Sequence, residues 1–158
     1  MFLAALVLIL SAGLLLFYLQ AACQRILRRP FDQDYFRAIV NANRLEFPAV
    51  RKALENIDPP LDYARLRMML KCDFLALAYL LKNAANVNQR YSWDEWLLIV
   101  YFRLLFVTLF LRRLLQFRMK PAVLVLTAIL QYFANVVGLR VNTVRFGNLT
   151  ASDYLLNI

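Results

Sequence analysis

The first 23 residues form an unbroken apolar run, MFLAALVLILSAGLLLFYLQAAC, that carries no charged side chain. A helix of this length is long enough to cross the roughly 30 Å hydrocarbon core of a bilayer. A cleaved signal peptide would need a basic segment before the run and a small-residue cleavage site after it. Here Met1 leads directly into the run, and LQAAC only faintly resembles a lipoprotein cleavage box, since Gln20 stands where a small or aliphatic residue is usual. We therefore predict an uncleaved transmembrane anchor over residues 1–23.

Arginines follow this apolar run at positions 25, 28 and 29, and no charge precedes it. By the positive-inside rule, the N-terminus lies outside and the rest of the chain begins in the cytoplasm. Pro30 then ends the helix or turns the chain away.

Between residues 31 and 91, apolar positions recur at helical spacing. In DQDYFRAIVNANR, Asp32 or Asp34 is a candidate N-cap for a first short helix. Pro48 suits the first turn of a second helix, PAVRKALENI. Asp58 is the predicted cap of a third helix of about 25 residues without a breaker. Its apolar part, FLALAYLL, is too short to span a membrane and predicts the central core helix of one compact unit.

The stretch YSWDEWLLIVYFRLLFVTLFLRRLLQFRMK opens on a capping box made by Ser92 and Glu95, so a helix begins near Trp93. Charged residues ring both of its ends, and Arg103 is the one charge in the apolar middle. An amphipathic helix lying on a membrane would show a lasting polar face, which this helix lacks. Two interpretations remain: a transmembrane segment with tryptophans near an interface, and a core helix wrapped by others.

A further apolar helix, PAVLVLTAILQYFANVVG, is predicted to begin at Pro121 and to end at Gly138 as its C-cap. Its three polar positions, Thr127, Gln131 and Asn135, are spaced by four residues and therefore form one polar stripe along the helix.

An antiparallel hairpin that turns near Gln116 would bring Arg103 opposite residues 129–131. We therefore predict that Arg103 and Gln131 form a buried polar pair that fixes the register of the hairpin, because a buried guanidinium without acceptors is very costly. The alternative is that Arg103 contacts an acidic partner or a lipid headgroup.

The number of membrane spans depends on whether this hairpin crosses the bilayer. If it did, its basic turn RRLLQFRMK would lie outside with four positive charges and no acid, against the positive-inside rule. If it does not, every basic cluster is cytoplasmic, and each basic residue near anionic headgroups contributes about 1 kcal/mol to membrane binding. We favour a single span with a membrane-hugging helical domain over residues 24–139. The side chains expected to contact a partner or lipid are Arg103, Arg112, Arg113, Arg118, Lys120, Trp93 and Trp96.

The last residues, 140–158, predict a separate C-terminal arm. The segment VNTVRF suits a short strand or an extended arm, and ASDYLL suits a terminal helical turn. Asn148 and Thr150 form a glycosylation sequon, which we expect to be unused in a cytoplasmic segment.

Composition supports a helical membrane protein. The 158 residues are 62% hydrophobic, against roughly 45–50% in soluble domains, and include three glycines. The net charge of +9 is uneven, since residues 96–158 hold seven basic residues and one acidic residue. A chain that is both apolar and basic fits membranes, whose anionic lipids complement both properties.

The sequence offers little catalytic chemistry. Without histidine it cannot build a Ser-His-Asp triad or a His-ligated zinc or haem site, and two cysteines are too few for an iron–sulfur cluster. The carboxylate pairs at 32/34, 58/62 and 94/95 stand where helix starts need caps. Fifteen of nineteen basic residues are arginine, which we attribute to a GC-rich bacterial genome rather than to nucleic-acid binding. We expect no enzyme activity, no cofactor and no metal.

The sequence therefore predicts an all-α protein, in which an N-terminal transmembrane anchor precedes a compact helical bundle with an apolar C-terminal helical hairpin. Its expected function is that of a non-catalytic accessory, assembly or scaffold subunit of a larger complex in the bacterial inner membrane, because its helices carry more apolar surface than so short a chain hides from water. The expected partners are membrane lipids and other subunits of that complex. The alternative is a small three-span membrane protein that binds a lipid or another hydrophobic ligand between its helices.

Overall fold

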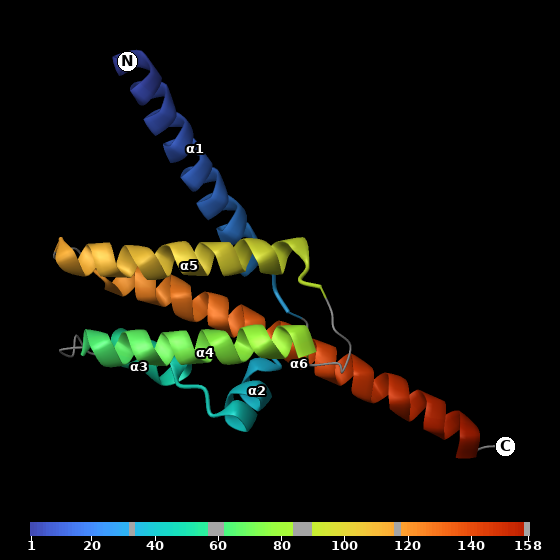
Figure 1. Cartoon of the computed structure of the whole chain (residues 1–158). Coiled ribbons are helices and arrows are strands. Elements are labelled where there is room, and N and C mark those ends of the chain that lie inside the picture. The colour runs from blue at the N-terminus through green and yellow to red at the C-terminus, as the bar shows by residue number, and fades with distance from the viewer. Residues whose placement is uncertain (32–33, 57–61, 84–89, 116–117, 157–158) are drawn as a thin grey trace.

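A computed structural model of the chain describes residues 1–31, 34–56, 62–83, 90–115 and 118–156, and side chains as far as residue 144. Within these ranges the ordered elements are all helices (Figure 1). They are α1 (Phe2–Leu27), α2 (Phe36–Asn43), α3 (Phe47–Asn56), α4 (Tyr63–Asn83), α5 (Trp93–Leu114) and α6 (Lys120–Leu156). The predicted all-α fold, with an apolar N-terminal helix and a helical bundle after it, is confirmed.

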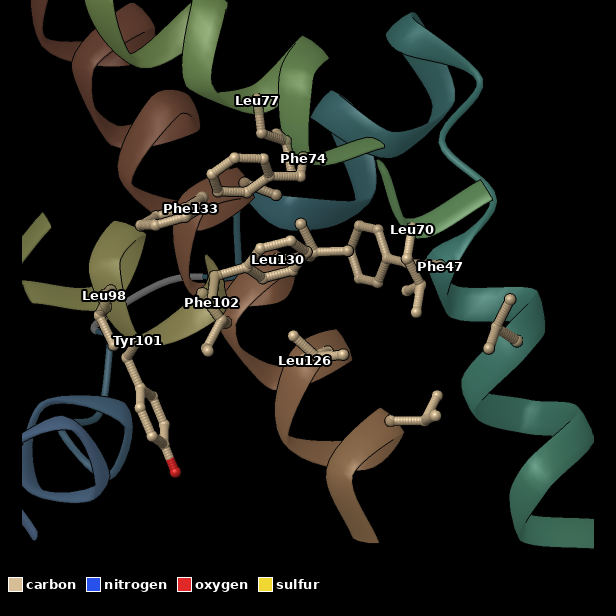
Figure 2. Packing of buried hydrophobic residues seen from close by; sticks show 14 of the residues in the cluster. Phe47, Leu70, Phe74, Leu77, Leu98, Tyr101, Phe102, Leu126, Leu130 and Phe133 are labelled. Atoms are coloured by element: carbon tan, nitrogen blue, oxygen red, sulfur yellow. The ribbon is translucent and has the colours of Figure 1, made fainter. Parts of the chain in front are cut away.

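Helix α6 is the centre of the bundle and packs against each of the other five helices. Its residues Leu126, Leu130 and Phe133 are fully buried, and Figure 2 shows them among apolar side chains of α3, α4 and α5. The prediction that FLALAYLL in α4 is the central core helix is wrong, because Leu75 and Tyr79 on its outer side are exposed. An apolar run marks a buried helix only where neighbours cover every side of it.

Helix α1 extends away from the bundle, and its N-terminal end lies far from the other helices (Figure 1). Its large side chains are exposed from Met1 to Tyr18, whereas Cys23 and Ile26 near its end are buried against the domain. After the helix, Arg29 forms an ion pair of 2.7 Å with Asp94 of α5. The chain therefore presents a long apolar helix that the protein itself does not cover.

Two helices in the described ranges are long and apolar enough to cross a membrane, namely α1 and the part of α6 from Lys120 to Val144. The apolar window of α1 has no buried residue, whereas that of α6 is mostly buried inside the bundle. Helix α5 is not among them, since every 18-residue stretch of it contains three charged residues.

Gly138 does not end α6, as the sequence had indicated, because the helix continues to Leu156. A Cβ atom at this position would lie 2.3 Å from Cβ of Tyr35, which precedes α2. The glycine therefore allows close packing in mid-helix rather than a left-handed C-cap. The same finding corrects the prediction for VNTVRF, which is helical and neither a strand nor an extended arm.

The helix starts agree with the sequence in part. Pro48 lies in the first turn of α3, as predicted. Asp34 does not cap α2, because the N-cap residue is Tyr35 and has no side-chain capping bond. At the start of α4, Asp62 accepts a hydrogen bond of 3.1 Å from the backbone N–H of Ala64. The other predicted caps, Asp32 and Asp58, and the hairpin turn at Gln116 lie outside the described residues.

Candidate functional site

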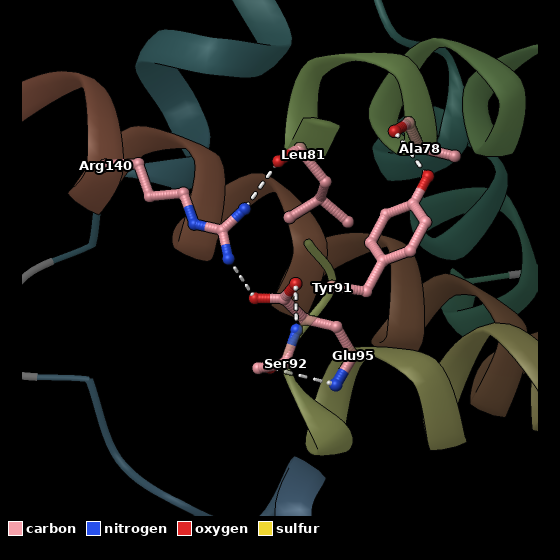
Figure 3. Close-up of polar contacts among 6 residues, drawn as sticks. All are labelled: Ala78, Leu81, Tyr91, Ser92, Glu95 and Arg140. Carbon is pink, nitrogen blue, oxygen red and sulfur yellow. Dashed lines mark hydrogen bonds and ion pairs between the residues drawn. The ribbon is translucent and has the colours of Figure 1, made fainter. Parts of the chain in front are cut away.

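A buried ionic cluster joins α4, α5 and α6 (Figure 3). The predicted capping box is confirmed: Ser92 Oγ accepts from the N–H of Glu95, and the Glu95 carboxylate accepts from the N–H of Ser92 at 3.1 Å. The carboxylate also pairs with Arg140, which in turn donates to the Leu81 carbonyl near the end of α4. Because the Glu95 side chain is only 4% exposed, this pairing neutralises a charge held inside the protein. The cluster fixes three helices relative to one another.

The polar stripe of α6 holds the short helices α2 and α3, not α5. Gln131 accepts a hydrogen bond of 2.6 Å from the Arg51 guanidinium of α3. Asn135 accepts one of 2.9 Å from the N–H of Phe36 at the start of α2. Thr127, also in the stripe, donates to the Leu124 carbonyl within α6. The stripe therefore supplies side-chain partners for two helices that precede it by about 80 to 100 residues.

The predicted pair of Arg103 and Gln131 does not form. Arg103 is exposed on α5, and the Gln131 oxygen is already bound to Arg51. The predicted hairpin fixed only the position of the two residues along their helices and not the direction of their side chains. Arg103 is on the exposed side of α5, whereas Gln131 faces α3. Arg103 instead lies at the edge of the exposed face of α5 and makes no hydrogen bond or ion pair with the described part of the chain.

A second buried carboxylate, Asp73 of α4, caps α3 from outside. It accepts hydrogen bonds from the backbone N–H groups of Glu46 and Phe47, at 2.9 and 2.7 Å. Burial raises the pKa of Asp73, and the two backbone hydrogen bonds oppose this rise. The carboxylate thus serves the packing of α3 on α4.

We expect Asp73→Ala to lower the free energy of unfolding by about 2 kcal/mol, because it leaves two backbone donors at a helix start without an acceptor. Asp73→Asn keeps an acceptor and is the matched control. Since folding raises the pKa, the native state binds the proton more tightly, and the contribution of Asp73 to stability falls as pH rises from about 4 through the folded-state pKa. Denaturant unfolding of the wild type and the Asn variant at several pH values should show this fall in the wild type alone. Equal stability of the wild type and the Ala variant would contradict the capping role.

One face of α5 is apolar and largely exposed, except where half-buried Val100 lies in the groove against α1. We call it the α5 face; its residues are Trp93, Trp96, Leu104, Val107, Leu111 and Leu114. At about 100° per residue they occupy an arc of about 80° that contains no charged side chain. Trp93 is 71% exposed and stacks on Trp96 at a ring distance of 5.4 Å. The opposite side of α5 packs on the bundle through residues such as Leu98 and Phe102. The helix is therefore covered on one side and bare on the other.

The predicted basic contact residues lie around the end of α5 and the start of α6. Arg112 donates to the Arg118 carbonyl at 3.1 Å, and the guanidinium of Arg113 lies 4.4 Å from the ring centre of Tyr63. Arg118 and Lys120 are exposed. Of the seven residues predicted to contact a partner or lipid, the two tryptophans share the α5 face and Arg103 borders it. Arg112 and Arg113 lie on other sides of the last turn of α5, and Arg118 and Lys120 lie beyond its end.

Within the described residues, no group of three or more Cys, Asp or Glu side chains is placed to hold a metal ion. Comparison with protein-family models, with curated proteins and with solved structures found no match.

The sequence missed the polar residues that join distant helices. The sequence predicts that Arg140 belongs to a separate arm, because it places the end of the helix at Gly138. Asp73 stands directly before the apolar run FLALAYLL of α4, and a carboxylate beside such a run is the signal that could have indicated a buried partner. No local pattern pointed to Arg51 as the partner of Gln131.

Proposed function

We propose that this protein is a non-catalytic accessory or assembly subunit of a larger bacterial membrane complex. In this proposal α1 crosses the membrane once, with the N-terminus outside, and the α5 face rests on the cytoplasmic surface of the same bilayer. The observation that carries the proposal is the apolar surface shared by the two helices. A groove of about 480 Å³, lined by Tyr18 of α1 and by Trp93 and Trp96 of α5, joins the exposed part of α1 to the α5 face.

The arrangement of the helices supports a membrane on the α1 side of the bundle. In Figure 1, α1 extends to one side of α5, and α2, α3 and α4 lie on the other side. A bilayer around α1 would therefore meet α5 first. Trp93, Trp96 and Arg103 of α5 suit a position at the membrane surface. Indole rings prefer the membrane interface, and an arginine side chain can reach from it to the headgroups.

A three-span arrangement is less compatible with the packing. It would place α6 in the hydrocarbon together with the helices that surround it. Among these, α2, α3 and α4 expose charged side chains, including Arg37, Lys52 and Lys71. Each such residue at the bilayer centre costs about 2.5–3.5 kcal/mol or more. We therefore favour α6 as the core helix of a domain outside the hydrocarbon.

Two observations support the accessory role: the buried carboxylates in the described residues have structural roles, and the last described side chains of α6 form an exposed apolar surface. Both buried carboxylates, Asp73 and Glu95, bind backbone N–H groups at helix starts. The C-terminal part of α6 extends past the other helices (Figure 1) and exposes Leu139, Val141 and Val144. Exposed apolar side chains on a projecting helix suit contact with another subunit.

Purification from the native membrane in mild detergent tests this role. We expect a membrane protein to co-purify at fixed stoichiometry. Leu139→Gln/Val141→Gln/Val144→Gln should release it by making the exposed apolar side of this helix end polar, while the circular dichroism melt of the bundle stays unchanged. A full-length protein that purifies alone would contradict the accessory role.

Reporter fusions test the orientation and the number of spans separately. A reporter after Arg29 and one inserted at Gln116 should both report the cytoplasm, and one before Met1 should report the outside. An external signal at Gln116 would favour three spans instead.

A further inference from the structure

A groove of about 440 Å³ lies between α4 and α5 on the flank of the bundle. Its lining combines the cations Arg67, Lys71 and Arg113 with the apolar or aromatic side chains Tyr63, Met68 and Phe106. No carboxylate in the described ranges pairs with any of the three cations. Three positive charges around an apolar groove, without an acid, form a site for an anion that also carries apolar groups.

The two arginines are held in place by aromatic rings of the opposite helix. The guanidinium of Arg67 in α4 lies 5.3 Å from the ring centre of Phe106 in α5. That of Arg113 in α5 lies 4.4 Å from the ring centre of Tyr63 in α4. Stacking on a ring restrains a guanidinium and leaves its N–H groups free, and these suit the bidentate binding of phosphate.

Tyr63 supplies an independent sign that a ligand belongs here. The residue is only 8% exposed, and its hydroxyl is the one buried side-chain polar atom in the described part of the chain that has no hydrogen-bond partner. Buried polar atoms nearly always have a partner, so an unpaired one in a groove lining requires an explanation. An oxygen of a bound anion would provide the missing acceptor once the side chains that enclose the hydroxyl shift to admit it.

We propose that this groove binds the phosphate headgroup of an anionic phospholipid. The proposal rests on the proposed position of α5 on the membrane. An interfacial helix sinks about 5–10 Å into the headgroup boundary, which brings its opposite flank to the level of the phosphates. On the circumference of α5, exposed Phe110 lies between Arg113 of the groove and Val107 of the α5 face. Phe110 thus links the groove to the α5 face past Arg103, which lies between them nearer the start of the helix, and the acyl chains of a lipid bound in the groove would follow this apolar path into the bilayer.

Native mass spectrometry of the full-length protein from a neutral detergent tests this proposal. The probes are a short-chain phosphatidylglycerol, the matching phosphatidylcholine and inorganic phosphate. We expect retention of one phosphatidylglycerol, with little phosphatidylcholine. Arg67→Gln/Lys71→Gln/Arg113→Gln should weaken retention about 100-fold, since each basic residue contributes about fivefold. The matched control removes three exposed charges elsewhere, Arg37→Gln/Lys52→Gln/Lys82→Gln, and should retain the lipid as the wild type does.

A variant that removes only the Tyr63 hydroxyl tests the groove without a loss of folding stability. Tyr63→Phe should weaken retention about tenfold by removing the hydroxyl donor, and should leave thermal stability unchanged or raised. Equal retention by the wild type and both groove variants would overturn the proposal, as would equal loss in the matched control. Displacement of the lipid by millimolar inorganic phosphate would identify a soluble phosphate compound as the ligand and overturn the lipid assignment.

The outcome for the groove is separable from that for the membrane position of α5. If fluorescence of Trp93 and Trp96 is quenched by brominated lipids while lipid retention does not depend on the groove, the groove proposal fails alone. If that quenching is absent in the wild type, the proposed function fails first.

Discussion

Replacing Arg140 by alanine is expected to lower the free energy of unfolding of the helical domain by about 3–5 kcal/mol, the usual cost of removing one partner of a buried ion pair. The substitution leaves the Glu95 carboxylate inside the protein without its counter-charge. It also removes the donor to the Leu81 carbonyl near the end of α4. Denaturant unfolding in mild detergent, followed by circular dichroism, measures the loss.

The matched control is the ion pair of Arg29 with Asp94, whose side chains are 60% and 32% exposed. Arg29→Ala should cost only about 0–1 kcal/mol, because water solvates the remaining carboxylate. If Arg140→Ala cost no more than Arg29→Ala, the buried cluster would not hold the three helices together.

Gly138→Leu is the second substitution for which we expect a large loss of stability, of about 3 kcal/mol. A side chain at this position enters the space of Tyr35, whose Cβ would lie 2.3 Å from the new Cβ. The start of α2 must then move from α6, and two hydrogen bonds would be lost with it, from the Phe36 N–H to Asn135 and from Asn142 to the Tyr35 hydroxyl. Gly138→Ala should cost about 1–2 kcal/mol, since its overlap exceeds the gain of about 1 kcal/mol in helix propensity.

Gly13→Ala controls for the change in propensity, because a Cβ there meets no atom within 4 Å. It should leave the unfolding of the domain unchanged. If Gly138→Ala stabilised the domain, the close contact with Tyr35 would be contradicted. Gly138 would then behave as a mid-helix glycine without a steric role, for which alanine is the better helix former.

The parts of the fold that depend on local pattern could be predicted from the sequence. The apolar run of residues 1–23 and the capping box of Ser92 and Glu95 are local patterns. The structure confirms a helix over the first and the predicted hydrogen bonds of the second. The extent of α6 was not, because a glycine near the end of an apolar run suits a C-cap and a close helix contact equally well. Only the position of Tyr35, about 100 residues earlier, distinguishes the two.

Which sides of α5 are buried and which are exposed could also not be predicted from the sequence. The lack of a polar face argues against an interfacial position for an isolated helix, yet the other side of α5 is covered by the bundle and has no need to face water. The domain as a whole therefore has an apolar side, formed by α5, and a polar side, formed by other helices, although α5 alone has no polar face. For the same reason Arg103 was expected to be buried, whereas it borders an exposed apolar face.

The proposed position of α5 along the membrane surface determines the depth of tryptophans placed on it, and this depth can be measured. The chain has two tryptophans, both at the start of α5. Two variants are compared in bilayers with lipids brominated at shallow or deep positions: Trp96→Phe, which reports Trp93, and Trp93→Phe/Trp96→Phe/Leu104→Trp, which reports a site about 16 Å along the helix.

We predict that both tryptophans are quenched by the shallow bromines and share one depth, since a helix in the membrane plane holds positions 93 and 104 at the same level. Preferential quenching of the tryptophan at position 104 by the deep bromines would instead show that α5 crosses the bilayer. Quenching of both by aqueous acrylamide alone would show that the α5 face does not touch the membrane at all.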